Sequence, residues 1–491
     1  MAYNEIATSN CPPEKGKTMS NHSIVSHFAG VIRRFQPAPA LDLHSLYQQP
    51  DQLPRMVRES PEALRCLQLL GPLAWDQFPE RDLQRNYGQP STPYAALAAA
   101  CLLKLELGID SYARLSRWLA ETPSIAWLLG FHSREGTFKP ANLPDQRHFS
   151  RLLHKAPNAC FQYLLSSSVH ALLAEFARRN VAVPEIVSID TKHILAWVKE
   201  NNPKAYVAER FDKTRQPAGD KDCKLGCKRS HNRRKGEDEA PPATPTSNPL
   251  PGETVKVGEY YWGYASGVAA MKVHGWGEFV LAELTQPFDR PDVSYFFPLL
   301  ALVEQRLGKK PRFGTLDAAF DAFYVYEYFH QAGGLAAVPF AEKGKTAHRS
   351  FDAQGLPLCA AGLAMPLKRK YLDRTSTLLE HERGQYVCPL FYPTATDQPC
   401  QVNDDHWLSG GCVTTLATSL GARLRHQLDR EGPVYQQIYK QRTAVERINS
   451  QAVELGIERP RLRNGRAIAN INTLIYTLIN LRLLRRIAQQ D

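Results

Sequence analysis

The order of strand-like and helix-like segments between residues 181 and 340 constrains the fold more than any other feature of the chain. The segments are a strand at 181–189, two strands at 259–269 and 278–285 joined as a hairpin, a helix at 292–307, a strand at 312–316, a helix at 319–331 and a strand at 335–340. Strands mixed with helices in this order predict an α/β domain whose sheet is flanked by helices.

The flanking sequence predicts further domains on both sides of this core. Residues 1–56 are polar and Pro-rich, which predicts a flexible N-terminal segment, and residues 57–179 show helical periodicity, which predicts an all-helical domain. Within the core at 180–340, a basic, Pro-rich loop is expected at 213–256. The remaining boundaries are a β-rich insertion at 341–430 and a helical return to the core, with a basic C-terminal helix, at 431–491.

Three acidic residues lie where this topology would bring them together. Asp190 follows the first strand and Asp317 follows the strand at 312–316. Glu446 lies in a single helix expected at 434–451, where it shares one face with Tyr439 and Arg442. Carboxylate oxygens suit Mg²⁺, and three converging carboxylates would repel one another without a metal. The pattern predicts a site for two Mg²⁺ ions, for which Mn²⁺ can substitute, as used in phosphodiester chemistry.

The same residues also have simpler explanations. An aspartate at a strand end often caps a turn or a helix, which applies to Asp317 and to Asp190. Glu446 can form a surface ion pair with Arg442 at spacing i, i+4, worth only ~0.3–0.5 kcal/mol. Asp321 is expected in the first turn of a helix and not as a ligand.

The spacing Tyr439-x2-Arg442-x3-Glu446 resembles the Y-R-E signature of bacterial insertion-sequence transposases of the DDE class. Residues 188–192 and 315–321 resemble the first and second aspartate motifs of that class, and the order of the core segments is ribonuclease-H-like. The resemblance covers nearly the whole chain. It implies a ribonuclease-H-like mixed sheet, with metal bound by Asp190, Asp317 and Glu446, and with Tyr439 and Arg442 in contact with the DNA backbone.

What the resemblance implies for function is an enzyme, a DNA transposase. It would cleave at transposon ends in the presence of Mg²⁺ and transfer the 3′-hydroxyl ends into target DNA. The expected partners are double-stranded DNA, both as terminal inverted repeats and as target, and a second copy of the chain in a homodimer on DNA. Two alternatives are a catalytically silent DNA-binding protein derived from a transposase and a nuclease or resolvase of the same fold.

One position departs from the signature. A lysine usually follows the glutamate by seven residues, but this chain has Val453 there. Either another cation such as Arg447 or Arg459 takes its place, or the contact is absent.

The basic residues predict where DNA is contacted. The formal net charge of +11 favours a polyanionic partner. Two basic clusters are predicted to contact phosphates, with a solvated loop as the alternative for the first. The first cluster comprises Lys228, Arg229, Arg233, Arg234 and Lys235, and the second comprises Arg459, Arg461 and Arg463, beside Arg447.

Cysteines and apolar runs give the remaining expectations. Cys359, Cys388, Cys400 and Cys412 all fall in the insertion and could close a tetrahedral zinc site, although free buried thiols are the alternative. The longest uncharged apolar run, at 94–103, is about half of the ~20 residues that a membrane span needs. We therefore expect a cytoplasmic, nucleoid-associated protein without a membrane segment.

Overall fold

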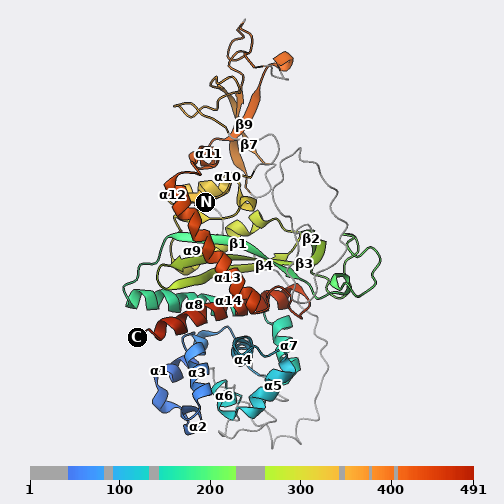
Figure 1. The fold of residues 1–491 in the computed structure, drawn as a ribbon, viewed down its shortest axis with the longest axis vertical. Helices are drawn as coiled ribbons and strands as arrows, with labels where there is room; N and C mark the ends of the chain where they lie inside the picture. The colour runs from blue at the N-terminus through green and yellow to red at the C-terminus, as the bar shows by residue number, and fades with distance from the viewer. Residues whose placement is uncertain are drawn as a thin grey trace, which may run out of the picture.

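The computed structural model describes residues 42–81, 92–131, 143–227, 260–341, 349–374, 379–396, 398–402 and 407–490. Three parts follow one another along the long axis of the protein (Figure 1): a group of N-terminal helices, a mixed β-sheet with helices on its faces, and a small antiparallel sheet. The chain is therefore a mixed α/β protein, as the order of the predicted segments indicated.

The N-terminal region is helical, as predicted. Its described α-helices are α1 (Leu43–Gln48), α2 (Arg55–Arg58), α3 (Pro61–Leu70), α4 (Tyr94–Glu106), α5 (Tyr112–Glu121), α6 (Pro123–Leu128), α7 (Gln146–Lys155) and α8 (Asn158–Arg178). Leu43 and Leu53 are buried in the core, so the expectation of a flexible segment is wrong for residues 42–56. Residues 1–41 lie outside the described part of the chain.

The central sheet contains six strands in the described residues. They are β1 (Ile186–Leu195), β2 (Lys224–Cys227), β3 (Tyr260–Val273), β4 (Gly277–Pro287), β5 (Phe313–Thr315) and β6 (Leu335–Ala337). The order is β2-β3-β1-β5-β6, and β4 pairs with β3. β1, β5 and β6 run parallel, whereas β3 runs antiparallel to β1 and β4, which confirms the predicted hairpin.

The first strand begins and ends later in the chain than the sequence suggested, at Ile186–Leu195 and not at 181–189. β3 pairs with β1 as far as Leu195, whereas the parallel partner β5 ends opposite Ser188. Asp190 therefore lies inside β1 and not after its end, which corrects the expected position. Because side chains alternate along a strand, Asp190 is on the same face of the sheet as Ser188.

Helices connect these strands and cover the sheet. The 3₁₀ turn η5 (Asp292–Tyr295) leads into α9 (Phe296–Leu307), and η6 (Ala318–Phe320) leads into α10 (Phe323–Gln331). Gly308 ends α9 with a φ of +68°, a conformation that glycine adopts without strain. The helices predicted at 292–307 and 319–331 are thus present, each preceded by a 3₁₀ turn.

The predicted β-rich insertion forms the small sheet. Its strands β7 (Leu367–Asp373), β8 (His381–Val387) and β9 (Val413–Ala417) pair antiparallel in that order. The next helix, α11 (Leu420–Gln427), packs on α10, where the Ala422 amide donates to Glu327 Oε2 at 3.1 Å. In Figure 1 the small sheet projects from the end of the molecule that carries α10 and α11.

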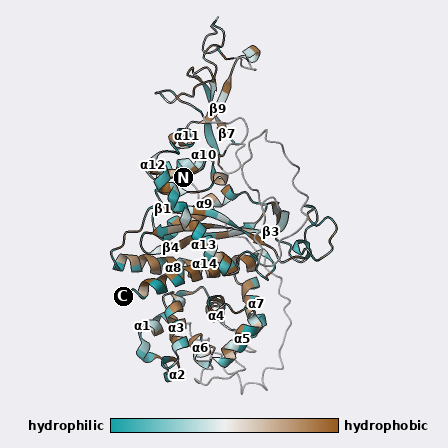
Figure 2. Cartoon of the chain, in the orientation of Figure 1, coloured by the Kyte–Doolittle hydropathy of each residue, from teal (hydrophilic) through white to brown (hydrophobic). Residues whose placement is uncertain are grey.

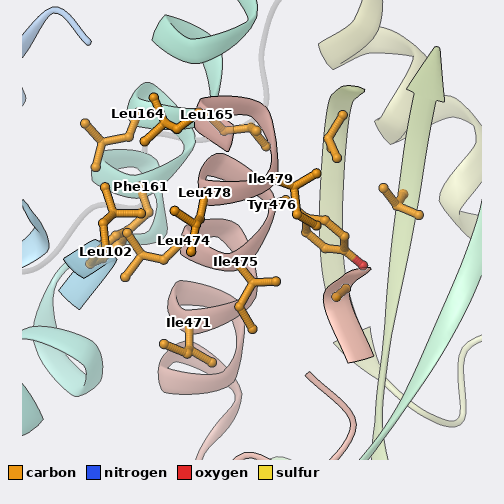
Figure 3. Packing of buried hydrophobic residues seen from close by; sticks show 14 of the residues in the cluster. Leu102, Phe161, Leu164, Leu165, Ile471, Leu474, Ile475, Tyr476, Leu478 and Ile479 are labelled. Atoms are coloured by element: carbon orange, nitrogen blue, oxygen red, sulfur yellow. The ribbon is translucent and has the colours of Figure 1, made fainter. Parts of the chain in front are cut away.

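The chain returns to the central sheet through four elements: α12 (Pro433–Tyr439), the 3₁₀ turn η8 (Lys440–Arg442), α13 (Thr443–Glu454) and α14 (Gly465–Ala488). α14 lies between the N-terminal helices and the sheet, and every residue from Asn470 to Leu481 is buried. In Figure 3, Leu474 and Leu478 face Phe161 of α8 and Leu102 of α4, whereas Tyr476 faces the strands. Hydrophobic residues accordingly gather along α8, α14 and the strands (Figure 2).

The C-terminal helix is apolar enough to resemble a membrane span. By length and composition α14 is the one described helix that could cross a bilayer, but 89% of its most apolar window is buried inside the protein. The arginines in its last turns contact protein groups. Arg482 and Arg485 both pair with Glu106 at 2.7 Å, and Arg486 donates to the Trp276 carbonyl at 3.1 Å.

Polar side chains fix α14 to the sheet at an irregularity in β4. The pairing of β4 with β3 skips one residue at Leu281, which makes a bulge. Asn480 of α14 donates to the Val280 carbonyl at 2.9 Å and accepts from the Val280 amide at 2.8 Å. Arg306 of α9 donates to the Leu281 carbonyl at 2.5 Å. The bulge leaves backbone groups without ladder partners, and side chains from α14 and α9 satisfy them.

A fully buried carboxylate lies next to this bulge. Glu283 of β4 accepts hydrogen bonds from Gln162 of α8 at 2.9 Å, from Ser266 and Thr285 at 3.3 Å each, and from Thr473 of α14. Burial raises the pKa of Glu283 to about 7, although these hydrogen bonds oppose the rise. One acid therefore joins the helical domain, the sheet and the C-terminal helix.

Candidate functional site

Asp190 and Asp317 lie side by side at one end of the parallel strands. Ser188 of β1 is opposite Thr315 of β5, and each aspartate follows its strand residue by two positions in extended backbone. Both carboxylates therefore leave the same face of the sheet. Neighbouring strands lie about 4.8 Å apart, so the topology brings these two residues together as the sequence predicted.

The segment that carries Glu446 is not the single helix expected at 434–451. It is divided into α12, η8 and α13. The Ser188 hydroxyl donates to the Gln441 carbonyl at 2.8 Å, and the Thr315 hydroxyl donates to the Tyr439 carbonyl at 3.4 Å. These bonds hold the junction of α12 and α13 over the two strands, beside the aspartates.

Two side chains from this junction reach Asp190. Asn449 Nδ2 donates to Asp190 Oδ2 at 3.1 Å, and Arg442 Nη2 lies 3.8 Å from Oδ1. Burial raises the pKa of Asp190 to about 7; Arg442 opposes the rise, and the charges of Asp317 and Asp292 add to it. Asp190 is thus a carboxylate with too little positive charge around it.

The other two carboxylates have contacts of their own. Asp317 accepts the Ala319 amide at 3.0 Å and so caps η6, as the simpler explanation of this residue proposed. Asp292 begins η5 and accepts the Thr191 hydroxyl at 2.9 Å. A capping bond uses one carboxylate oxygen and leaves the charge of Asp317 close to Asp190.

Glu446 is paired with Arg442 in this structure. The two side chains are 2.7 Å apart, and the Glu446 side chain is 51% exposed. Burial alone would lower the pKa of Arg442, but Asp190, Tyr439 and Glu446 raise it. Among the described residues, no group of three or more His, Cys, Asp or Glu side chains is arranged to hold a metal ion. The three carboxylates therefore lie near one another in the fold, but they do not converge on a common point.

The oxygen atoms around Asp190 are nevertheless of the kind that binds a hard divalent cation. The Asn449 Oδ1 atom, next to Asp190, is buried and has no hydrogen-bond partner within the described chain. An oxygen without a donor beside a carboxylate of raised pKa is an environment that a cation would stabilise. Carboxylate and amide oxygens are the ligands that Mg²⁺ and Mn²⁺ prefer. For Glu446 to join them, it would have to leave Arg442.

The residues predicted to contact DNA have different surroundings. Tyr439 stacks on Tyr435 with ring centroids 5.6 Å apart. Arg447 pairs with the nearly buried Glu278 at 2.7 Å, so it is engaged by the β3–β4 hairpin. Val453, where the signature has a lysine, is partly exposed on α13.

Of the two basic clusters, one can be described. Arg459, Arg461 and Arg463 lie in the segment between α13 and α14, with the guanidinium of Arg463 5.4 Å from the ring centroid of Trp197. The first cluster, Lys228, Arg229, Arg233, Arg234 and Lys235, lies outside the described residues.

The described part of the basic loop is anchored to the protein core. Asp220 is buried and accepts the Tyr264 hydroxyl at 2.8 Å and the Asn464 amide at 3.0 Å. Asp222 accepts the Gly465 amide at 2.9 Å, at the start of α14. The two acids of the loop therefore fix it to the N-terminus of α14, a contact that the sequence did not reveal.

The insertion cysteines do not form a metal site in the described residues. None of Cys359, Cys388, Cys400 and Cys412 is in a disulfide, and among the described residues no group that could bind a metal includes them. Cys388 is buried, and the other three are partly exposed. The alternative of free thiols describes this structure better than the zinc site.

Sequence reasoning missed three residues of the acidic site. Asn449 follows Arg442 by seven residues and Glu446 by three, so helical periodicity could have found it. Ser188 and Thr315 each precede an aspartate by two residues, which strand periodicity places on the same face. Their role in holding the helix junction required the structure.

Comparison with known protein families finds no family model that matches this chain, and comparison with curated proteins finds no significant match.

Proposed function

We propose that this chain is a DNA transposase of the DDE class, which cleaves at transposon ends and transfers 3′-hydroxyl ends into target DNA. The observation that carries the proposal is the pairing of β1 with β5, which sets Asp190 and Asp317 side by side beneath the helix junction that bears Glu446. The resemblance of the Tyr439, Arg442 and Glu446 spacing to the signature of that class supports it.

The strand order also supports a ribonuclease-H-like core. Five strands, β4-β3-β1-β5-β6, give the order 3-2-1-4-5 when counted along the chain without β2, and the middle strand of this order carries the first acid. The first, fourth and fifth strands are parallel, and the second is antiparallel to its neighbours. This arrangement fits the fold that the resemblance implies.

Within this proposal, Asp190, Asp317 and Glu446 would hold two Mg²⁺ ions, which would supply an activated attacking oxygen and a stabilised leaving oxygen. The side chains around them have separate tasks. Asn449 orients Asp190 through its hydrogen bond to Oδ2. Arg442, once released by Glu446, would present its guanidinium to a backbone phosphate.

The direct test uses the DNA that flanks the gene of this protein. We expect purified protein with Mg²⁺ to cut labelled duplex at the two ends of its element and to join the resulting 3′-hydroxyl ends to a second duplex. Sequencing of the cut and joined products maps both steps. Cutting that needs no flanking repeats would favour the nuclease or resolvase alternative.

A catalytically silent DNA-binding protein is the second candidate. The observation that favours it is the Arg442–Glu446 ion pair, which leaves Glu446 apart from the two aspartates. This candidate predicts binding of the flanking DNA without cleavage at any Mg²⁺ or Mn²⁺ concentration. Cleavage that is lost in Glu446→Gln would exclude it.

A further inference from the structure

A pocket of about 360 Å³ lies where the small sheet meets the body of the protein. It is lined by residues of β7, β8 and β9, by the start of α10 and by α11, the elements that adjoin at this junction in Figure 1. Four arginines and two aspartates face one another there: Arg349, Arg383, Arg423 and Arg425 against Asp321 and Asp373. Four positive charges less two negative charges leave an excess of two, with the lining histidines neutral.

The two aspartates are already paired with two of the arginines. Arg425 makes two hydrogen bonds to Asp321, at 2.9 and 2.7 Å, and the Asp321 side chain is fully buried. Arg383 pairs with Asp373 at 2.9 Å. Asp321 is thus a structural partner of α11, which differs from its expected place in the first turn of a helix.

The other two arginines contact neutral groups. Arg349 donates to the Thr414 hydroxyl, and Arg423 donates to the Gly355 carbonyl at 2.9 Å and to the Tyr386 hydroxyl at 2.6 Å. Within the described residues, the lining of the pocket supplies no carboxylate to either of them. The excess charge of the pocket therefore belongs to Arg349 and Arg423.

Unsatisfied nitrogens add to this excess. Arg383 Nε, Arg423 Nε and His426 Nδ1 are buried without a hydrogen-bond partner in the described chain. Burial lowers the pKa of Arg349, and the neighbouring Arg383 and Arg425 lower it further. Burial and the same kind of repulsion lower the pKa of His426 to about 4. A polar cavity with a surplus of positive charge and unused donors is suited to an anion.

We propose that this pocket binds a phosphate group, held by Arg349, Arg383 and Arg423. Guanidinium groups offer paired N–H donors that match phosphate oxygens, which favours phosphate over chloride. Bound there, the group would link strand β8 of the small sheet and the segment of Arg349 to α11. A free phosphate compound and a nucleic-acid backbone share this chemistry. The inference is independent of the proposed strand transfer, because its ligands are separate from Asp190, Asp317 and Glu446.

Calorimetry on the full chain tests the proposal with pyrophosphate as the probe, in chloride buffer at fixed ionic strength. We expect saturable binding with one site per chain. Arg349→Gln and Arg423→Gln should each weaken it at least about tenfold, as expected for loss of a charged hydrogen bond. Arg349→Lys should retain part of the affinity, a charge dependence that a purely structural role would not produce. Arg369→Gln is the matched control, because Arg369 is exposed on β7, outside the pocket, where it donates to Gln385 and lies over the Tyr371 ring.

Duplex DNA binding distinguishes the two sources of phosphate. If the phosphate group belongs to nucleic acid, Arg349→Gln should bind duplex more weakly than Arg369→Gln. The slope of its log affinity against log salt concentration should also be smaller, by about the amount expected for one lost phosphate contact. If it is a free compound, both variants should bind duplex equally while only Arg349→Gln loses pyrophosphate. Thermal unfolding in chloride confirms that each variant is folded. The proposal is overturned if the wild-type protein does not bind pyrophosphate and Arg349→Gln binds duplex as strongly as Arg369→Gln does. It is also overturned if folded Arg349→Gln and Arg423→Gln bind pyrophosphate as the wild-type protein does.

Discussion

Asp190 and Glu283 are carboxylates on the same face of the same sheet, separated only by Val268 of the intervening strand β3. Burial raises the pKa of both to about 7. Glu283 is fully buried and accepts hydrogen bonds from three hydroxyls and one amide, which come from four elements of the protein. Asp190 has one amide donor and an arginine 3.8 Å away, and its side chain is 17% exposed.

The difference between the two sites is in what surrounds the acid. Neutral donors satisfy Glu283 inside the protein, so its hydrogen bonds hold the helical domain, the sheet and α14 together. Asp190 is buried close to Asp317 and Asp292, and Arg442 opposes the resulting rise in its pKa without cancelling it. A raised pKa alone therefore does not identify a functional acid. The supply of hydrogen-bond donors and the access to solvent separate a structural carboxylate from one that can exchange partners.

The sharpest way to break this comparison is to neutralise each acid in turn. Asp190→Asn should lower Mg²⁺-dependent cleavage at least about 10³-fold, because loss of a metal ligand removes several kcal/mol of transition-state stabilisation. Duplex binding and thermal stability should be retained. The rate of cleavage of labelled end DNA measures the effect, with Glu283→Gln as the control that keeps activity. Full cleavage by Asp190→Asn would contradict the proposed site.

The reverse experiment concerns stability. Glu283→Ala should lower the free energy of unfolding by about 2–4 kcal/mol, because it leaves buried donors on Gln162 and Thr473 without an acceptor. Glu283→Gln retains an acceptor oxygen and should cost much less. Urea denaturation measures both variants. Equal losses for Ala and Gln would contradict this prediction, because Gln fills the same volume and keeps one acceptor oxygen; the loss would then depend on the carboxylate itself and not on the cavity.

The pH dependence of stability should separate the acids as well. The folded protein binds protons at Glu283 up to pH about 7, whereas the unfolded chain releases them near pH 4.5. The free energy of unfolding should therefore fall by about 3 kcal/mol as pH rises from about 4.5 to 7, and this contribution should then level off. Urea titrations at pH 5 and 8 should show a smaller fall in Glu283→Gln than in wild type. Identical falls in the two proteins would argue against a titrating Glu283.

Asp190 should contribute a second fall in the free energy of unfolding between about pH 4 and 7, because its pKa is raised from 3.8 in the unfolded chain to about 7 in the folded protein. A divalent cation bound beside the carboxylate would lower that pKa. In Mg²⁺, the Asp190 part of the fall should therefore disappear while the Glu283 part remains.

The sequence predicted the mixed α/β class and the hairpin of β3 and β4, because the order of strands and helices allows few topologies. It brought Asp190 and Asp317 together for the same reason. It also suggested that the helix of Glu446 returns to these residues, and the contact of Asn449 with Asp190 places that helix there. The sequence missed β2, which lies within the residues expected to form a loop.

What the sequence could not predict depends on contacts between distant segments. The break between α12 and α13 accompanies hydroxyl bonds from Ser188 and Thr315, which periodicity within residues 434–451 cannot reveal. The burial of α14 on every side likewise requires both the N-terminal helices and the sheet as neighbours. Arg447 was predicted to contact DNA, but in the structure it pairs with Glu278, which is 169 positions away in the sequence. Sequence patterns cannot reveal a pairing over that distance.

The smallest effects are expected when two arginines at the helix junction, Arg442 and Arg447, are replaced in turn. Arg442 lowers the pKa of Asp190, so Arg442→Gln should raise that pKa further and move the acidic limb of the cleavage rate to higher pH. Because the pKa of Asp190 is already about 7, an increase of one unit would lower its deprotonated fraction at pH 7, and with it the rate, about fivefold. Arg447 pairs with Glu278 and not with the aspartates, so Arg447→Gln should change the rate less than about threefold and leave the pH profile in place. Rate measurements from pH 5 to 9 decide the matter, and a profile that moves equally in both variants would mean that Asp190 responds to the general positive charge of the junction and not to Arg442.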